Sequence, residues 1–347
     1  MSGDLSLKDY KPVSKLETSI SEIHEPRFPV IDAHNHLGET YGGGWINRPV
    51  RELLDVMDEA GVELLVDLDG GWGEEVLHNH LDHFKAQSPK RFVHFGGIDW
   101  EQWESLGNGF AAWAAKRLQA QKARGAQGLK VWKDLGLRVK DDQGALVKVD
   151  DPRLAPIWDI AGELDLPVVI HVADPVAFFD PLDPTNERWE EIHANPDWHF
   201  PSPPFPGFME IMNQLEALIK RHPRTIFIGA HVGCYVENLS WVGALLDQAP
   251  NFYLDISARI AELGRQPYTA RRFFIDYADR ILFGMDMAAE AALYRLHYRF
   301  LETDDEYFDY SFEEAPPSGR WKIYGLYLPE QVLEKVYGAN ARKVLRI

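Results

Sequence analysis

The sequence predicts a (β/α)8 barrel, the TIM-barrel fold, with long loop insertions after the fifth and eighth strands. Eight short apolar segments recur along the chain, segments with helical periodicity lie between them, and polar side chains gather where the apolar segments end. Strands that are nearly all apolar are typical of a parallel sheet covered by helices on both faces, and eight strand–helix units close naturally into a barrel. The alternative, an open doubly wound sheet, often carries a glycine-rich phosphate loop after its first strand, and this sequence has none there.

The elements follow from the local patterns. Strands are expected at residues 28–34, 63–69, 91–97, 128–132, 167–172, 225–231, 251–257 and 280–286. Apolar residues at helical spacing predict helices over 51–60, 78–87, 110–120, 154–164, 211–221, 239–249 and 328–345. The linkers 173–207 and 287–328 are too long for simple connections, and their aromatic content favours ordered lids. We therefore divide the chain into an N-terminal extension, 1–26, and a single barrel domain, 27–347.

Charge and composition narrow the classes of partner. The formal net charge is −18 at pH 7, and no cluster of lysines or arginines is long enough to offset it. Such a surface repels nucleic acid and anionic lipid, so we expect a small-molecule substrate and neither a nucleic-acid nor a membrane partner. The single cysteine, Cys234, excludes an internal disulfide, and the polar first residues lack an apolar signal core. A cytoplasmic protein is the expectation.

Polar residues interrupt the apolar strands at their C-terminal ends. His34 and His36 end the first strand, and His171, His231 and Asp286 end the fifth, sixth and eighth. Side chains at positions i and i+2 of a strand point to the same side, so His34 and His36 can reach one cation. A barrel gathers its strand ends around one mouth, where imidazole and carboxylate groups can bind Zn²⁺. The alternative, that each histidine is a core or loop residue hydrogen-bonded to the backbone, does not explain the matching residues on later strands.

The motifs in this order resemble the amidohydrolase superfamily, and within it the amidohydrolase-2 branch, which includes the aminocarboxymuconate semialdehyde decarboxylase-like enzymes. They span nearly the whole chain and are VIDAHNH at 30–36, IHV at 170–172, GAHVG at 229–233, LDIS at 254–257, ILFGMD at 281–286 and VYGANARKVL at 336–345. The chain departs from many relatives at Met285 and Met287, beside the last of the strand-end residues. Homo-oligomers are common in the family, which leaves a homo-oligomer as a further expectation.

The resemblance implies a metal centre with defined ligands. One divalent metal, most often Zn²⁺, would be held by His34, His36, His171 and Asp286, with His231 beside it as a catalytic or orienting group. Lys130 stands where binuclear relatives can carry a carboxylated lysine that bridges two metals. A salt-bridged or solvent-directed lysine is an equal alternative, and one metal is the expectation.

The implied reaction is hydrolysis of a small-molecule carbonyl. A water on the metal would have its pKa lowered to about 7 and would attack an amide, ester, lactone or C–C bond, with Asp286 as proton acceptor and His231 orienting the water or stabilising charge. The alternative reaction is non-oxidative decarboxylation of an aromatic or unsaturated acid, whose carboxylate Arg259 would bind. A surface salt bridge with Glu262 is the plainer role of Arg259.

An alternative of another class is a barrel that binds a metal or ligand without turnover. Its pocket would be lined by the aromatic side chains of Trp72, Trp132, Phe178 and Trp189. In an enzyme Trp132 and Phe178 are expected to bind substrate. Asp286 at the end of the eighth strand favours catalysis over binding alone.

Overall fold

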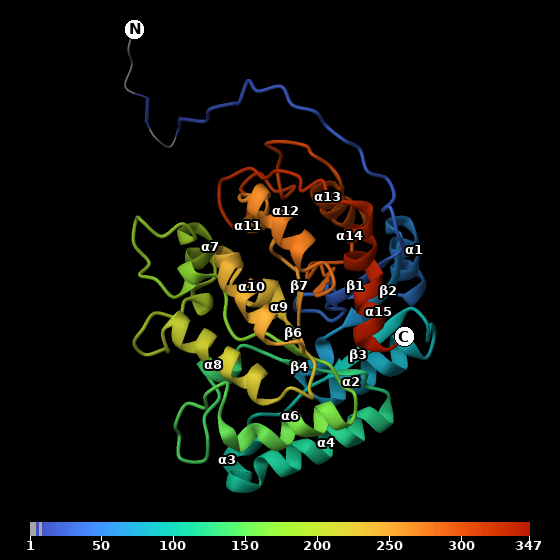
Figure 1. The fold of residues 1–347 in the computed structure, drawn as a ribbon, viewed down its shortest axis with the longest axis vertical. Helices are drawn as coiled ribbons and strands as arrows, with labels where there is room; N and C mark the ends of the chain where they lie inside the picture. Colours follow the sequence, from blue (N-terminus) through green and yellow to red (C-terminus); the bar gives the residue numbers. More distant parts are fainter. Residues whose placement is uncertain (1–4, 7–8) are drawn as a thin grey trace.

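Parallel strands form the centre of the molecule (Figure 1). Within the residues that the computed structural model describes, 5–6 and 9–347, eight strands lie side by side in chain order. They are β1 (Val30–Asn35), β2 (Val62–Asp67), β3 (Phe92–Gly96), β4 (Gly128–Val131), β5 (Val168–Ile170), β6 (Phe227–Gly229), β7 (Phe252–Asp255) and β8 (Ile281–Leu282). Every neighbouring pair is parallel, and the predicted eight-stranded barrel is confirmed.

The sheet closes between its first and last strands. The amide of Ala33 in β1 donates to the carbonyl of Phe283, just after β8, at 2.9 Å. The amide of Asp286 donates to the carbonyl of His34 at 2.8 Å. Barrel closure therefore places His34 beside Asp286, although the two residues lie near opposite ends of the chain.

Helices surround the barrel and connect its strands (Figure 1). The predicted helices are present as α1 (Val50–Ala60), α2 (Glu74–His80), α4 (Phe110–Arg124), α6 (Ala155–Glu163), α8 (Phe208–Arg221), α10 (Leu239–Gln248), α14 (Glu330–Glu334) and α15 (Asn340–Leu345). The helices expected over 78–87 and 328–345 each include a π-helical turn, which is Leu81–Lys85 after α2 and Lys335–Ala339 between α14 and α15. The structure adds α3 (Gln102–Leu106), α7 (Trp189–Ala194), α11 (Ile260–Leu263), α12 (Pro267–Asp276) and α13 (Ala291–Glu302). The short turns α5 (Asp134–Leu137) and α9 (Ala230–Gly233) contain residues with non-helical backbone angles.

Strand side chains alternate between the barrel interior and the surrounding helices. One buried cluster joins strand residues to α15 and consists of Ile31, Ala33, Leu64, Val66, Leu68, Val93, Phe95, Val169, Ile228, Ala230, Tyr253, Leu282, Ala341, Val344 and Leu345. We interpret this cluster as the barrel interior, covered at one end by α15. On β4, Leu129 and Val131 belong instead to the larger cluster that includes the helices. The inward position of β4 is therefore occupied by Lys130, which is 1% exposed.

The insertions after β5 and β8 are tied together by one buried arginine. Arg188, just before α7, is 2% exposed and pairs with Glu191 at 2.6 Å. It also pairs with Glu262 of α11 and donates to the carbonyl of Ser318 at 3.2 Å. Because Ser318 lies in the insertion after β8, Arg188 joins both insertions to α11.

The N-terminal segment runs along the outside of the barrel (Figure 1). Ser21 donates to the buried carboxylate of Asp305 through its amide and its hydroxyl, at 2.8 Å each. Arg299 of α13 pairs with the same carboxylate at 2.6 Å. Asp305 is therefore one anchor of the segment 10–29 on the barrel, and Arg27 adds another through the amide it donates to Glu302 and its ion pair with Glu330, at 3.1 and 2.8 Å.

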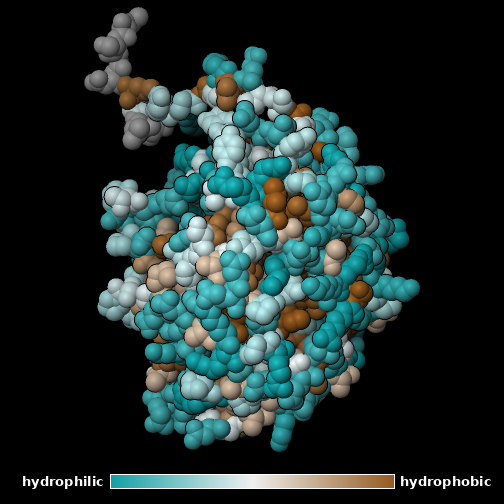
Figure 2. Space-filling model, viewed as in Figure 1, coloured by the Kyte–Doolittle hydropathy of each residue, from teal (hydrophilic) through white to brown (hydrophobic). Residues whose placement is uncertain are grey.

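The face shown in Figure 2 is mostly hydrophilic, and its apolar residues are scattered in small groups. Exposed large apolar side chains include Tyr268 and Phe312. In the part of the chain that the structure describes, none of the helices is long and apolar enough to cross a membrane.

Candidate metal centre

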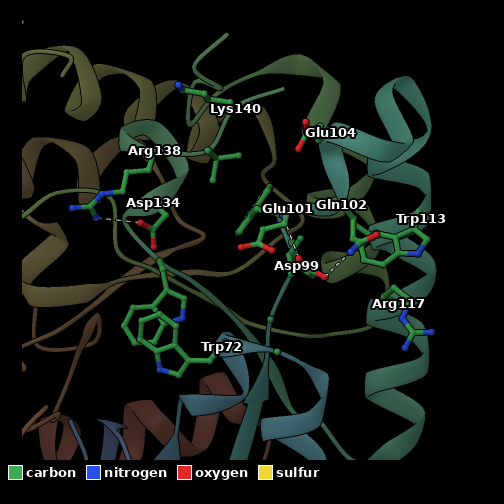
Figure 3. A pocket seen from close by; sticks show the side chains of 18 of the residues that line it. Trp72, Asp99, Glu101, Gln102, Glu104, Trp113, Arg117, Asp134, Arg138 and Lys140 are labelled. Carbon is green, nitrogen blue, oxygen red and sulfur yellow. Dashed lines mark hydrogen bonds and ion pairs between the residues drawn. The ribbon is translucent and has the colours of Figure 1, made fainter. Parts of the chain in front are cut away.

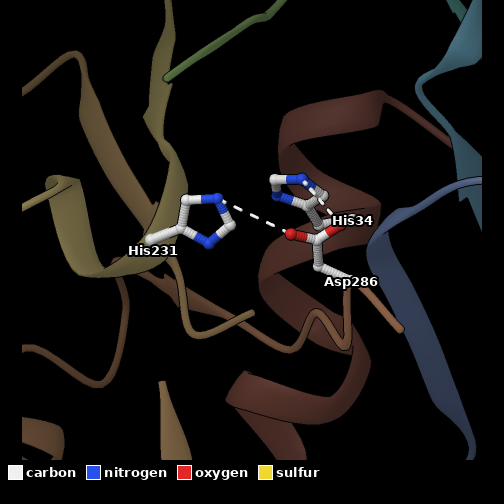
Figure 4. Close-up of side chains that lie close together, drawn as sticks. All are labelled: His34, His231 and Asp286. Atoms are coloured by element: carbon white, nitrogen blue, oxygen red, sulfur yellow. Dashed lines mark ion pairs between the residues drawn. The ribbon is translucent and has the colours of Figure 1, made fainter. Parts of the chain in front are cut away.

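Side chains from the ends of three strands meet in the mouth of the barrel. His34 ends β1, His231 lies in the turn α9 directly after β6, and Asp286 follows β8. Figure 4 shows the carboxylate of Asp286 facing the rings of both His34 and His231. The backbone is left-handed at His231 (φ 57°) and at Asp286 (φ 53°). That conformation is costly for residues other than glycine and is often found at functional sites.

The distances around Asp286 fit a shared cation. Its Oδ1 lies 3.2 Å from Nε2 of His36 and 3.8 Å from Nε2 of His34, and its Oδ2 lies 3.6 Å from Nε2 of His231. The ligand atoms of His34, His231 and Asp286 all lie within 4.8 Å of one another. Tetrahedral ligands about 2 Å from Zn²⁺ are about 3.3 Å apart, so small shifts would bring these atoms onto one ion. His36 reaches the same carboxylate but stands outside that group of three.

Carboxylates fix the rings of the two histidines from β1. Nδ1 of His34 lies 2.8 Å from Oδ2 of Asp255 at the end of β7. Nδ1 of His36 lies 2.7 Å from Oδ1 of Asp69, which follows β2. An ionised carboxylate only accepts hydrogen bonds, so Nδ1 carries a proton in both rings. Each ring therefore turns Nε2 toward Asp286, the way in which outer carboxylates orient metal-binding histidines.

A backbone carbonyl fixes the third ring. Nδ1 of His231 lies 2.9 Å from the carbonyl oxygen of Ser257, which also can only accept. The Ser257 hydroxyl donates to Asp255 at 2.6 Å and so joins this anchor to that of His34. His231 thus also presents Nε2 to Asp286.

His171 lies beside the group but turns a different atom toward it. Its ring is edge-on to that of His231, with centroids 4.5 Å apart. Its Nε2 lies 3.3 Å from Oδ1 of Asp174, a carboxylate that also pairs with Lys133. Burial lowers the pKa of His171 to about 4, so the ring is neutral at pH 7. The structure brings His171 to the centre with Nε2 directed at Asp174 rather than at Asp286.

Lys130 points at the centre from the barrel interior. Its Nζ lies 3.3 Å from Nε2 of His34 and 4.5 Å from the centre of the Trp132 ring. Burial lowers the pKa of Lys130 to about 8. A cation bound by His34 would use the lone pair that Lys130 now faces, so the charge of this lysine depends on what the centre holds.

At pH 7 some of the polar groups of the centre are neutral and others are charged. Burial lowers the pKa of His34, and that of His231 far more, so these rings are neutral at pH 7. Burial acts in the same direction on His36, but the hydrogen bonds and charges of Asp286 and Asp69 outweigh it and raise its pKa to about 9. Burial opposes ionisation of Asp286, yet the hydrogen bond and charge of His36 and the charge of Lys130 hold its pKa below the usual range. A metal bound through His36 must therefore displace a proton.

The aromatic side chains expected to bind substrate lie at different distances from the centre. Trp132, just after β4, stacks on His36 with ring centroids 5.3 Å apart. Phe178, in the insertion after β5, is 2% exposed and stacks on Trp198 at 6.3 Å. Trp132 therefore lies beside the centre, whereas Phe178 packs inside the insertion.

Arg259 is buried at the mouth without a carboxylate partner among the described residues. It follows β7, is 9% exposed and donates to the carbonyl of Ala258 at 2.7 Å. Its charge contributes to the low pKa of His231, which places it near the centre. The plainer expectation of a pair with Glu262 is wrong, because Glu262 pairs with Arg188 instead.

A second group of buried histidines lies beneath the Asp69 anchor and was missed by the sequence reasoning. His80 of α2 and His94 of β3 place Nδ1 at 2.7 and 2.8 Å from the same oxygen of Asp67. The other oxygen of Asp67 accepts from the amide of Asp69 at 3.1 Å. These are hydrogen-bond distances, shorter than the spacing of about 3.3 Å between two ligands of one ion. We interpret the group as support for the loop that carries Asp69.

Comparisons with known proteins agree with this fold and these motifs. Residues 31–347 match the family described as Amidohydrolase, and no curated protein matches the chain in sequence. One similar solved structure is the 2,6-dihydroxybenzoate decarboxylase from Rhizobium, with 17% identity over 94% of this chain and 99% of the other and a TM-score of 0.55.

Similar structures also include a second decarboxylase and a hydrolase. A dihydroxybenzoic acid decarboxylase from Polaromonas sp. JS666, with bound manganese and the inhibitor 2-nitroresorcinol, has 20% identity over 92% of this chain and 97% of the other, with a TM-score of 0.54. A probable 2-pyrone-4,6-dicarboxylic acid hydrolase from Acinetobacter baumannii, with citric acid bound, has 11% identity over 92% and 100%, with a TM-score of 0.52. At these identities the likeness shows the fold alone. The family match covers the whole barrel, and the chain belongs to the amidohydrolase-2 family of the amidohydrolase superfamily.

Proposed function

We propose that this chain is a metal-dependent hydrolase that acts on the carbonyl group of a small molecule. The observation that carries the proposal is the convergence of three imidazole Nε2 atoms, from His34, His36 and His231, on the carboxylate of Asp286. Buried polar groups are costly unless they share partners, and rings anchored at Nδ1 suit a common ligand at Nε2. A divalent cation there would supply Lewis-acid chemistry and lower the pKa of a water to about 7. Zn²⁺ is the first expectation, and Mn²⁺, which the Polaromonas decarboxylase binds, is the alternative to test.

Residues of the chain supply the base and the orientation for this reaction. Asp286 is ionised and has both oxygens directed into the group, so it can accept a proton from the attacking water. His231 is neutral, and its Nε2 faces the same carboxylate at 3.6 Å, where it can orient the water or stabilise charge on the attacked carbonyl. Water adds across the bond to the carbonyl, which yields a carboxylate and the freed amine, alcohol or carbon fragment.

The proposed ligand set is His34, His36, His171 and Asp286, with His231 kept for catalysis. His171 would then have to turn its Nε2 away from Asp174. The alternative set uses His231, which already faces Asp286. Metal content separates the two sets, because His171→Ala lowers the bound metal in the first and His231→Ala lowers it in the second. Equal loss in both variants would favour a five-residue centre over either set.

Substitution of Asp286 tests the catalytic proposal. Protein loaded with Zn²⁺ or Mn²⁺ is assayed on aryl amides, esters and lactones, and Asp286→Asn should lose at least about 100-fold in turnover while the histidines keep most of the metal. Asp276→Asn, on the exposed side of α12, is the matched control and should retain wild-type turnover. Unchanged turnover in Asp286→Asn rejects the proposed base.

Non-oxidative decarboxylation is the second candidate, and Arg259 favours it. A buried guanidinium without a carboxylate partner is suited to bind the carboxylate of an acid, and Lys130 adds a second positive charge at the centre. In this reaction the carbon–carboxylate bond breaks, CO₂ leaves, and the carbon takes a proton from the site. The solved relatives whose names include 2,6-dihydroxybenzoate or dihydroxybenzoic acid decarboxylase make these acids the first substrates to try.

Product analysis decides between the two reactions. The metal-loaded protein is incubated with 2,6-dihydroxybenzoate and, separately, with the panel of amides, esters and lactones, and CO₂ and new carboxylate are both measured. CO₂ from the acid identifies a decarboxylase, and Arg259→Leu should then raise KM more than Arg259→Lys. New carboxylate without CO₂ identifies a hydrolase.

A further inference from the structure

A cavity of about 1290 Å³ opens beside the metal centre on the same face of the barrel. It is lined by the loops that follow β2, β3 and β4 and by residues of α3 and α4, and Figure 3 shows side chains of this lining. The metal centre uses the ends of β1, β6 and β8, so the cavity occupies a different sector of the mouth. Loops at this end of a TIM barrel are where such enzymes bind their substrates.

A stack of aromatic rings connects the metal centre to the cavity. The His36 ring stacks on Trp132 at 5.3 Å, and Trp132 stacks on Trp72 at 4.0 Å. Trp72 is 49% exposed, an unusual exposure for so large an apolar side chain, and it lines the cavity with Trp132. Trp100 and Trp113 line the same cavity. Tyr41 also stacks on Trp72, with ring centroids 6.2 Å apart. A bound molecule that reaches from the centre therefore meets this aromatic stack first.

The charge of the cavity lining is strongly negative. Its basic side chains are Arg117, Arg138 and Lys140, and its acidic side chains are Glu74, Asp99, Glu101, Glu104, Asp134, Asp141 and Asp142. Arg117 pairs with Glu74, and Arg138 pairs with Asp134 at 3.2 Å. Within the described residues, Glu101 and Glu104 have no cationic partner, and Figure 3 shows the Glu101 carboxylate on the side of the cavity facing Trp72.

We propose that this cavity binds an organic cation, an ammonium or amidinium group on an apolar or aromatic body, as the distal part of the substrate. Indole faces attract cations through the negative face of the ring, and tryptophan does so most strongly of the aromatic side chains. Unpaired carboxylates such as Glu101 add attraction for the cation and repel an anion. The positive side chains Lys130 and Arg259 lie at the metal centre, so the substrate would carry its acidic or carbonyl end there and its cationic end over Trp72.

The assignment as a substrate subsite rests on the proposed function, whereas binding of the cation does not. Calorimetry with tryptamine and indole-3-acetate measures this binding directly, because the two probes share an indole and differ in the sign of their charge. The full-length protein should bind tryptamine about tenfold more tightly than indole-3-acetate. Asp286→Asn should bind tryptamine like the wild type, so a failure of the metal chemistry does not affect this test.

Variants locate the binding in the cavity. Trp72→Ala and the double variant Glu101→Gln/Glu104→Gln should each weaken tryptamine binding about fivefold. The controls Trp189→Ala and Glu334→Gln, on α7 and α14, should leave it unchanged. Equal affinity for the two probes, or wild-type affinity in both cavity variants, overturns the proposal. Competitive inhibition of turnover by tryptamine, once a substrate is in hand, would place the cation in the substrate path, and non-competitive inhibition would remove it from that path.

Discussion

Asp255→Asn tests whether the carboxylate behind His34 is needed for metal binding. Oδ2 of Asp255 accepts from Nδ1 of His34 at 2.8 Å, while Oδ1 accepts from the amides of His231 (3.0 Å) and Ser257 (3.1 Å) and from the Ser257 hydroxyl (2.6 Å). An asparagine keeps the three bonds at Oδ1 only if its oxygen stays there, so its NH₂ group then faces His34. The His34 ring must then accept a hydrogen bond at Nδ1 and carry its own proton on Nε2, which is the nitrogen that would bind the metal.

The magnitude follows from the lost bond. A hydrogen bond to a charged group contributes about 1.5–3 kcal/mol, and each 1.4 kcal/mol corresponds to about tenfold in affinity. Zn²⁺ should therefore bind Asp255→Asn about 10–100-fold more weakly, the range found when outer partners of metal ligands are removed. Competition with a chromophoric chelator at fixed pH measures the apparent Kd, and thermal unfolding of each variant confirms that it is folded.

Two further variants extend this test. Asp69→Asn changes the second carboxylate that orients a histidine of the centre, and Asp159→Asn changes a histidine–carboxylate pair outside the centre. Asp69→Asn should behave in the same way, because Oδ2 of Asp69 accepts from the amides of Leu37 and Gly38 and leaves the asparagine NH₂ facing His36. Asp159→Asn removes the partner of His222, 3.1 Å from its Nδ1, and should leave Zn²⁺ binding unchanged. Wild-type affinity in both anchor variants would show that the histidines do not need these carboxylates, and the proposed ligand geometry would fail.

Further predictions concern packing, the buried arginine and pH. Gly97→Ala should lower the free energy of unfolding by about 1–3 kcal/mol, because the added Cβ would lie 2.5 Å from Cα of Gly71. An unchanged unfolding curve in denaturant would contradict the tight contact between the loops that contain these two glycines. Arg188→Met should cost about 3–5 kcal/mol in thermal unfolding by leaving Glu262 buried and unpaired, and Arg188→Met/Glu262→Met should recover most of it; an equally unstable double variant would refute this cause. Burial alone would raise the pKa of Asp305, but its hydrogen bonds from the N-terminal segment and from α13 outweigh burial and lower it. A lowered folded pKa stabilises the folded state above the unfolded value of about 3.9, and this stabilisation is lost as pH falls toward the folded pKa. Hydrogen exchange of the Ser21 amide, corrected for its intrinsic rate, should therefore quicken below about pH 4 and should be fast at pH 7 in Asp305→Asn. Protection of this amide that depends on neither pH nor Asp305 would exclude this anchor.

The strands could be predicted because burial on both faces leaves a direct trace in the sequence. Nearly all strand positions are buried, so β-branched and apolar residues fill them, and the few polar exceptions mark the ends. The same reasoning placed His34 and Asp286 at one mouth, since barrel closure joins the first strand to the last. Helix α13 was less visible, because its pattern lies inside an acidic and aromatic insertion that suggested a lid.

Residues that orient the histidines could not be predicted as partners. Asp69 follows β2 and Asp255 ends β7, but their pairing with His36 and His34 depends on which strands become neighbours in space and on the side toward which each ring turns. The cavity beside the centre depends on the folding of loops after β2, β3 and β4, whose lengths and turns carry no periodic signal.

Position at the end of a strand does not decide whether His171 or His231 binds the metal. Both residues end buried strands, and their rings lie 4.5 Å apart, so either can reach a cation near Asp286. What separates them is the acceptor behind each ring: a backbone carbonyl holds Nδ1 of His231 and frees Nε2, whereas Asp174 occupies Nε2 of His171. A bound cation competes with Asp174 for that nitrogen, and Lys133, paired with the same carboxylate, would keep Asp174 neutralised when His171 turns away. Because the displaced carboxylate retains a partner, rotation of His171 toward the metal leaves no buried charge unpaired, and this favours His171 as a ligand.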